Sequence, residues 1–160
     1  MTVAAQAREE TPAPVAPPEE VVTVRRFCLP DLQTHGLWLY EKLQPKFPHI
    51  SQQYLTAWIR GAIETNQYYF VCTDKAAGIA QANHRPLVPQ PYVDVIFVHS
   101  IDDSDRGHEP AIYQAMERWG KGLGAFEMNY GDDLKADQIT AIKSSGSNLH
   151  KIYTYFSPID

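Results

Sequence analysis

The sequence predicts an α/β (α+β) fold in which helices cover both faces of a mixed central sheet. First, strand-like and helix-like hydrophobic patterns follow one another in the order β α α β β β α β α β, without an internal repeat. Second, residues 92–130 read as strand, loop, helix and strand, which is the pattern of a crossover between parallel strands. Third, 160 residues with 44% hydrophobic residues suit one domain with a proper core.

The first half of the chain predicts one strand and two helices. Residues 21–29 are valine-rich and predict a strand, which Pro30 stops, and Asp31 is a plausible N-cap for the helix that follows. Ser51 can cap the second helix. The apolar face of this second helix is formed by Tyr54, Leu55, Trp58, Ile59, Ala62 and Ile63.

The remaining elements follow from alternation, helical spacing and turn residues. The predicted strands are 68–73, 78–84, 92–99, 125–130 and 150–156, and the predicted helices run from Glu109 to Gly120 and over 134–143. The predicted sheet core consists of Val22, Val24, Phe70, Cys72, Val95, Phe97, Phe126 and Met128, covered by Trp58, Ile59, Met116 and Trp119.

Composition excludes several classes of function. The net charge of −5 argues against binding to nucleic acid or to an anionic membrane, since both require a basic face. No apolar run approaches the ~20 residues of a membrane span, and no basic and apolar leader precedes the domain. The six histidines lack metal-type spacing, so no metal site is expected. Cys28 and Cys72 are expected to be buried thiols in a reducing compartment. A disulfide between them is the alternative that the sequence leaves undecided.

Residues 1–20 differ from the domain predicted over 21–160. They combine several prolines and glutamates with no aromatic residue, so the segment is expected to be a flexible, polyproline-like arm. It is either a solvated tail or an arm that docks on a partner.

The order of elements resembles the GCN5-related N-acetyltransferase (GNAT) fold, with its mostly antiparallel sheet. The resemblance covers residue 21 to the end of the chain. In that family a Q/R-x-x-G-x-G/A loop between a strand and a helix cradles the pyrophosphate of coenzyme A at the start of the helix. The aligned loop here is RGHEPA, from Arg106 to Ala111. The resemblance assigns cofactor contacts to Arg106, Gly107, His108, Glu109 and Ala111.

The loop departs from the family pattern at its centre. Glu109 replaces the key glycine and is expected to direct a negative charge at the anion, and Pro110 removes one amide donor. Like charges at ~4 Å cost on the order of 4 kcal/mol, against about 8 kcal/mol for a micromolar ligand. Asp102, Asp103 and Asp105 add further negative charge to the loop. Weak or absent coenzyme A binding is therefore predicted.

The resemblance also implies a general base near the strand 92–99. The candidates are Asp94, His99 and His108, although each can equally be a strand-surface, strand-end or loop residue. The tyrosine that many members use as general acid is missing from residues 139–146, and Tyr130 or Tyr153 could take its place.

Three functions remain open. We favour a GNAT-like domain without catalysis that joins protein partners, including copies of itself, in a larger assembly. Its design resembles that of small GNAT-like virion proteins of tailed bacteriophages, so it is expected in the cytoplasm or in a virion. The alternatives are an acetyl-CoA-dependent N-acetyltransferase acting on an amine, and an acyl-CoA sensor without turnover.

Overall fold

The computed structural model describes residues 21–132, 134–151 and 154–159. The predicted arm of residues 1–20 and the candidate Tyr153 lie outside the described residues. Within the described chain one sheet of seven strands has the order β1-β2-β3-β4-β5-β7-β6. Neighbouring strands are antiparallel except β4 and β5, which confirms the predicted mixed, mostly antiparallel sheet.

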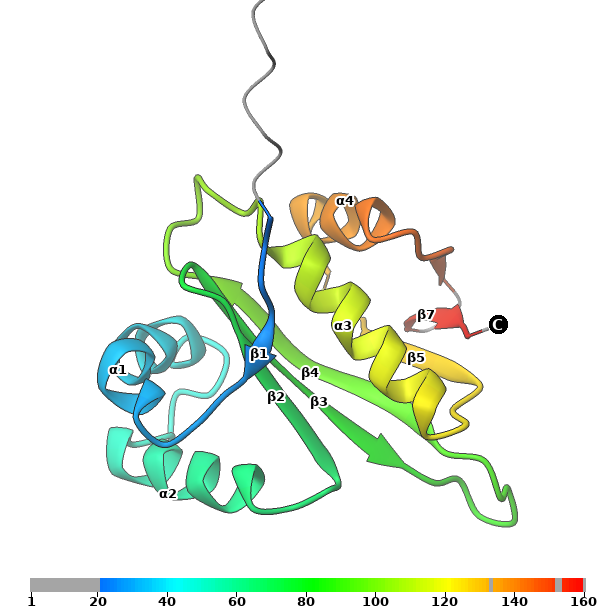
Figure 1. The fold of residues 1–160 in the computed structure, drawn as a ribbon, viewed down its shortest axis with the longest axis horizontal. Helices are drawn as coiled ribbons and strands as arrows, with labels where there is room; N and C mark the ends of the chain where they lie inside the picture. The colour runs from blue at the N-terminus through cyan, green and yellow to red at the C-terminus, as the bar shows by residue number, and fades with distance from the viewer. Residues whose placement is uncertain (1–20, 133, 152–153, 160) are drawn as a thin grey trace, which may run out of the picture.

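The elements follow one another along the chain as in Figure 1. Their bounds are β1 Arg25–Arg26, α1 Asp31–Leu43, α2 Gln52–Ile63, β2 Tyr68–Cys72, β3 Ala76–Asn83, β4 Tyr92–Ser100, α3 Glu109–Gly122, β5 Glu127–Gly131, α4 Ala136–Ser144, β6 His150–Lys151 and β7 Tyr155–Pro158.

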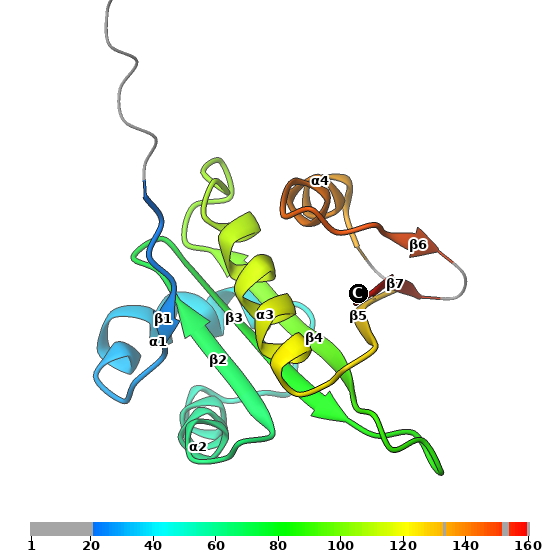
Figure 2. The same cartoon turned by 45° about the vertical axis from the view of Figure 1, so that its right-hand side comes forward.

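Helices cover both faces of the sheet, as predicted. Helices α1 and α2 lie on one side, and α3 crosses the other beside α4 (Figures 1 and 2). Each face has its own core: Phe70, Ile79 and Phe97 belong to the first, and Val93 and Met128 belong to the second. The sheet therefore separates two apolar layers, and β4 contributes side chains to both.

Two predicted strands differ from the structure. The first is reduced to Arg25–Arg26, because only these residues pair with β2 and Val21 ahead of them is exposed. The single strand predicted over 150–156 is wrong: it is a hairpin in which Tyr155 of β7 pairs with Lys151 of β6. Both arms of a hairpin keep the two-residue alternation, so the pattern did not reveal the reversal.

The two predicted helix caps have different outcomes. The Oγ of Ser51 accepts a hydrogen bond from the amide of Tyr54 at 3.0 Å, which confirms this cap. Asp31 instead occupies the first turn of α1. Its carboxylate accepts two hydrogen bonds from Arg25, at 2.6 and 2.7 Å, and one from the amide of Cys28 at 2.7 Å. Asp31 thus ties the strand end before α1 to the helix.

The predicted core is confirmed at its centre and not at its edges. Phe70, Cys72, Phe97, Met128, Ile59 and Met116 are buried. Val22, Val24, Val95, Phe126, Trp58 and Trp119 are only half-buried.

Close packing of α3 on β3 depends on Gly78. A Cβ atom at this position would lie 2.8 Å from Cε of Met116 and 2.9 Å from Cγ2 of Ile112. We therefore expect Gly78→Val to push α3 from the sheet and lower the free energy of unfolding by about 1–3 kcal/mol, measured by urea denaturation. Gly61 on α2 has open space around it, so Gly61→Ala should instead stabilise by up to about 1 kcal/mol. A Gly78→Val protein as stable as the parent would contradict this packing.

Candidate functional site

Strands β4 and β5 pair over a short distance and then separate. Their parallel register joins Val93 to Met128 and Asp94 to Asn129, and no further pair follows within the described chain. On its other edge β5 pairs with β7 from Glu127 to Gly131, so its pairing with β7 continues after the pairing with β4 has ended. The side of β4 that faces β5 is therefore left without a strand partner from residue 95 onward.

A β-bulge lies where the two strands separate. On the other side of β4, Ile79 pairs with Phe97 and Ala80 pairs with Val95, so Ile96 is an extra residue in β4. As a result, Ile96 and Phe97 both pack against the core beneath α1 and α2, whereas Val95 and Val98 pack against the opposite core. A bulge at such a position redirects side chains and frees backbone groups next to a binding site.

A cavity of about 300 Å³ occupies the opening between β4 and β5. Figure 2 shows α4 above the part of the sheet that contains β5 and β7. The cavity is lined by Pro45, Lys46, Val95, Ile96, Phe97, Val98, His99, Tyr113, Tyr130, Leu134, Lys135 and Gln138. Its walls are thus five consecutive residues of β4, two tyrosines, Pro45 and Lys46 after α1, and residues at the start of α4 and just before it.

The carboxylate of Glu109 does not face outward from the start of α3. Its side chain is fully buried, and the Oγ of Ser100 donates a 2.6 Å hydrogen bond to Oε2. The second oxygen, Oε1, has no hydrogen bond and lies 3.8 Å from Nη1 of Arg106. Burial raises the pKa of Glu109, in part opposed by Ser100 and Arg106. The expectation that this charge is directed at a bound anion is therefore corrected.

Basic side chains pair with the loop before α3. Arg106 lies 3.4 Å from Asp103 and 3.1 Å from Asp137 of α4. Lys42 of α1 forms an ion pair with Asp103 at 2.7 Å, and Lys75 forms one with Asp105 at 3.3 Å. The loop is accordingly less negative than its sequence suggests, but Arg106 already has acidic partners.

Of the three candidate bases, the structure brings only His99 to the cavity. Burial, followed by the charges of Lys42 and Arg106, lowers the pKa of His99 to about 4, so the imidazole is neutral at pH 7. Asp94 lies where β4 and β5 still pair, and its carboxylate accepts a 2.7 Å hydrogen bond from Asn83. His108 is buried against the β2–β3 turn, with Nδ1 2.8 Å from Oγ1 of Thr73.

Two tyrosines, Tyr130 and Tyr113, also line this cavity. Burial raises the pKa of Tyr130 to about 12, and its hydroxyl lies 3.3 Å from Oγ of Ser147. Tyr113 of α3 is also buried, which raises its pKa further. Both phenols therefore hold their protons at neutral pH. The sequence did not lead us to predict Tyr113 as a site residue, although its position four residues after Glu109 places it on the same face of α3.

One further cluster has metal-ligand chemistry. Ligand atoms of Asp31, His35 and Cys72 lie within 4.8 Å of one another, and all three residues are buried. The carboxylate of Asp31 is already bound by Arg25, however, and Nδ1 of His35 accepts a 2.9 Å hydrogen bond from the indole of Trp38. The neutral imidazole then carries its proton on Nε2, which opposes metal binding there. Cys28 and Cys72 are free thiols; Cys72 is buried as expected, whereas Cys28 is exposed, so the expectation of a buried thiol was wrong there.

Comparison with known proteins identifies the fold. No protein-family model and no curated protein matches the sequence. Among solved structures, an acetyltransferase of the GNAT family from Streptococcus pneumoniae superposes with a TM-score of 0.62, at 9% identity, over 87% of this chain and 99% of the other. A predicted acetyltransferase from Clostridium acetobutylicum, solved with acetyl-CoA, gives 0.62 at 11% identity over 79% and 90%. Aminoglycoside acetyltransferase AAC(6')-Ib, solved with coenzyme A and kanamycin, gives 0.65 at 8% identity over 86% and 94%.

The protein therefore has the GNAT fold, as the order of its elements predicted. Over the part of the chain that the structure describes, no helix is both long and apolar enough to cross a membrane.

The environment of His99 predicts how stability depends on pH. The pKa of this imidazole is about 4 in the folded protein and 6.5 for an unperturbed histidine, so only the unfolded chain takes up this proton as the pH falls between these values. Acidification from pH 7 to 4.5 should therefore cost about 2 kcal/mol through this residue. Urea denaturation should show that His99→Gln loses less stability than the parent over this interval. Equal losses in the two proteins would contradict the buried, neutral imidazole.

Proposed function

We propose that the protein binds an acyl-coenzyme A thioester between β4 and β5 and transfers the acyl group to an amine. The observation that carries this proposal is the cavity of about 300 Å³ that opens where β4 loses its pairing with β5. The likeness to acetyltransferase structures solved with acetyl-CoA or coenzyme A supports it. Acetyl-CoA is the donor to test first.

The residues present fit such a ligand in most respects. Val95 and Val98 give the cavity apolar walls for a pantetheine arm, and the unpaired backbone of β4 offers hydrogen bonds to its amides. Lys135, beside the start of α4, adds positive charge at the cavity wall. Within the described chain no side chain caps α3, but the amide of Glu109 donates to the carbonyl of Arg106 at 3.1 Å and that of Ile112 donates to the carbonyl of His108 at 3.4 Å. The amide of Ala111 is then the first-turn donor left for a pyrophosphate. Pro110 lies in that turn and lowers the number of amide donors.

The side chains on the cavity wall supply the proton transfers of acyl transfer. A bound thioester supplies an activated acyl carbon, which forms a C–N bond to the amine while its C–S bond breaks. His99 is neutral, so its imidazole accepts the proton that the amine loses, directly or through a water molecule. Tyr130 keeps its phenolic proton to high pH and donates it to the departing sulfur. The products are an amide and free coenzyme A, and the proton gained by His99 returns through water to the Tyr130 phenolate, which restores both side chains.

The second candidate is a domain without catalysis that joins a larger assembly, such as a phage virion. It is supported by Pro110 in the first turn of α3 and by the ion pairs that occupy Arg106, since both weaken a phosphate cradle. Its partners would be protein chains, including copies of this one. Residues 1–20 would then dock on a neighbouring chain. A related form, an acyl-CoA sensor, would bind the ligand without turnover.

Calorimetry with acetyl-CoA separates these candidates. We expect saturable binding, and at one hundred times the Kd the ligand should stabilise the fold by about 2.7 kcal/mol in a thermal melt. Leu134→Trp should abolish binding, because its larger ring fills the cavity from the wall beside α4. Leu123→Trp is the matched control, since Leu123 is exposed at the far end of α3. Absence of binding by the parent protein would favour the assembly component, and binding without transfer would favour the sensor.

Pro110 gives a second prediction for this site. Pro110→Ala restores one amide donor in the first turn of α3, and a hydrogen bond to a charged group contributes about 1.5–3 kcal/mol. The Kd for coenzyme A should therefore fall about tenfold or more in calorimetry, whereas Pro89→Ala, in the β3–β4 loop, should leave it unchanged. Unchanged affinity in Pro110→Ala would show that the phosphates do not bind at the start of α3.

A further inference from the structure

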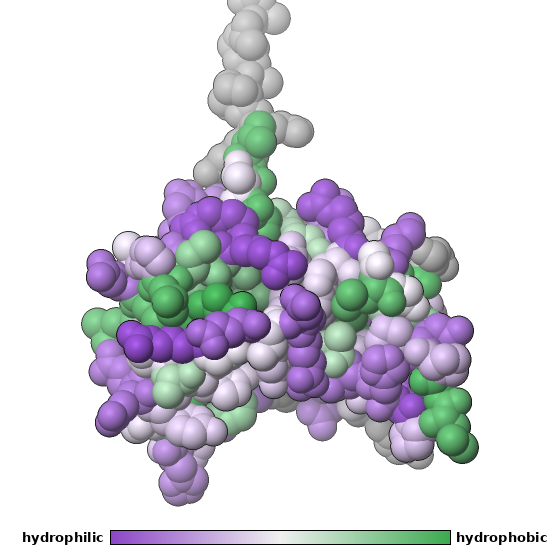
Figure 3. All heavy atoms as spheres, turned by 60° about the horizontal axis from the view of Figure 1, so that its bottom comes forward, coloured by the Kyte–Doolittle hydropathy of each residue, from purple (hydrophilic) through white to green (hydrophobic). Residues whose placement is uncertain are grey.

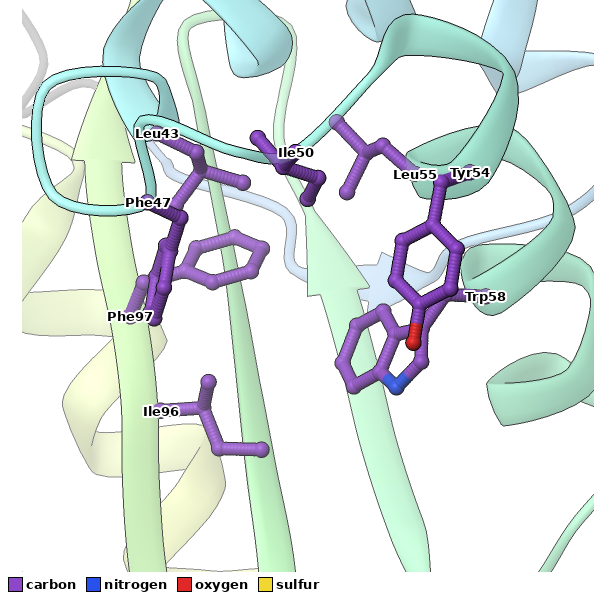
Figure 4. A pocket seen from close by; sticks show the side chains of 8 residues that line it. All are labelled: Leu43, Phe47, Ile50, Tyr54, Leu55, Trp58, Ile96 and Phe97. Atoms are coloured by element: carbon purple, nitrogen blue, oxygen red, sulfur yellow. The ribbon is translucent and has the colours of Figure 1, made fainter.

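A second pocket, of about 280 Å³, lies on the opposite face of β4, beneath α1 and α2. It is lined by Leu43, Phe47, Ile50, Tyr54, Leu55, Trp58, Ile96 and Phe97. Figure 4 shows the rings of Tyr54 and Trp58 on one side and Phe47 with Ile96 on the other, with an opening between them. Figure 3 shows hydrophobic residues gathered over the side of the molecule where α1 and α2 lie, with hydrophilic residues around them. We call the eight residues the aromatic pocket.

The aromatic pocket adjoins the cavity between β4 and β5. Ile96 and Phe97 line both spaces. The bulge at Ile96 causes this contact, because it places two consecutive side chains of β4 on the α1–α2 face at the point where β4 and β5 separate. A molecule in the aromatic pocket therefore lies next to an acyl group held against the same stretch of β4.

The lining restricts what this molecule can be. None of the eight residues carries a carboxylate, and the only polar groups among their side chains are the Tyr54 hydroxyl and the Trp58 indole N–H. A polyamine or an aminoglycoside holds several positive charges, which cannot be buried without acidic partners. A flat ring, in contrast, can pack between Tyr54 or Trp58 and the facing apolar side chains.

We infer that the acyl acceptor is a primary amine carrying an aromatic group on a short aliphatic linker. This inference rests on the proposed acyltransfer. The ring occupies the aromatic pocket, and the linker directs the amine past Ile96 and Phe97 toward the β4–β5 cavity. Apolar surroundings disfavour the ammonium form, so they increase the share of the neutral, nucleophilic amine.

The experiment compares acceptors with acetyl-CoA as the donor. We expect kcat/KM for 2-phenylethylamine to exceed that for putrescine and for kanamycin at least tenfold. Binding of 2-phenylethylamine without any donor is measured separately, through the change it causes in the fluorescence of the parent and of Trp58→Phe. The parent should respond and the variant should lose most of the response.

Two exposed residues of the pocket provide the decisive variant. Phe47 is 42% exposed and Tyr54 is 63% exposed, so replacing both with alanine leaves the core intact. The double variant should raise the KM for 2-phenylethylamine about tenfold or more and leave the Kd for coenzyme A unchanged. Leu37→Ala is the control, since Leu37 is 59% exposed on α1 and lies outside the pocket lining.

The outcomes distinguish the two proposals. Transfer to putrescine or kanamycin in preference to 2-phenylethylamine overturns the acceptor class and leaves the acyltransferase standing. An unchanged KM in the Phe47/Tyr54 double variant also overturns it. Failure of the parent to bind acetyl-CoA overturns the acyltransferase, whatever the fluorescence experiment shows.

Discussion

The parallel ladder between β4 and β5 stops after Asp94 and Asn129, and the candidate site depends on this stop. Backbone N–H and C=O groups away from water need partners, so a strand that loses its neighbour offers a row of donors and acceptors to a ligand. Here the lost neighbour leaves a cavity instead of a closed core, with Val95 to Val98 on one side and Tyr130 on the other. Strand β5 is stabilised in its divergent path by pairing with β7, so the opening is part of the folded sheet.

The bulge at Ile96 lies where β4 and β5 separate, and it affects the packing on the other face of the sheet. One extra residue changes which side of β4 the following side chains occupy, and Ile96 and Phe97 come to lie together beneath α1 and α2. The cavity between β4 and β5 and the aromatic pocket therefore meet at a single backbone irregularity. If the proposed transfer takes place, two spaces that share a strand bring the two reacting groups close together.

Glu109 shows how a charge read from the sequence can give a wrong physical expectation. The sequence placed a carboxylate where the family has glycine, and simple electrostatics then predicted repulsion of a phosphate. In the structure the carboxylate is turned inward, where the hydroxyl of Ser100, on the preceding strand, donates to it. Neither the burial of Glu109 nor the pairing of Arg106 with Asp137 of α4 could be predicted, because both partners are set by tertiary packing. The missing amide donor of Pro110, in contrast, is a property of the residue itself and remains.

Local sequence was enough to specify the order of elements as far as α4, the mixed sheet with helices on both faces, the Ser51 cap and the presence of His99 on the strand that borders the cavity. These features depend on local periodicity and local hydrogen bonding, which neighbouring residues specify. The hairpin of β6 and β7, the bulge and the aromatic pocket depend instead on tertiary contacts. The run from Val95 to Val98 is apolar throughout, so its pattern does not indicate which side chain faces which core. That choice follows from the register with β3 and from the packing of α3 over Gly78, and both bring together residues that are distant in the chain.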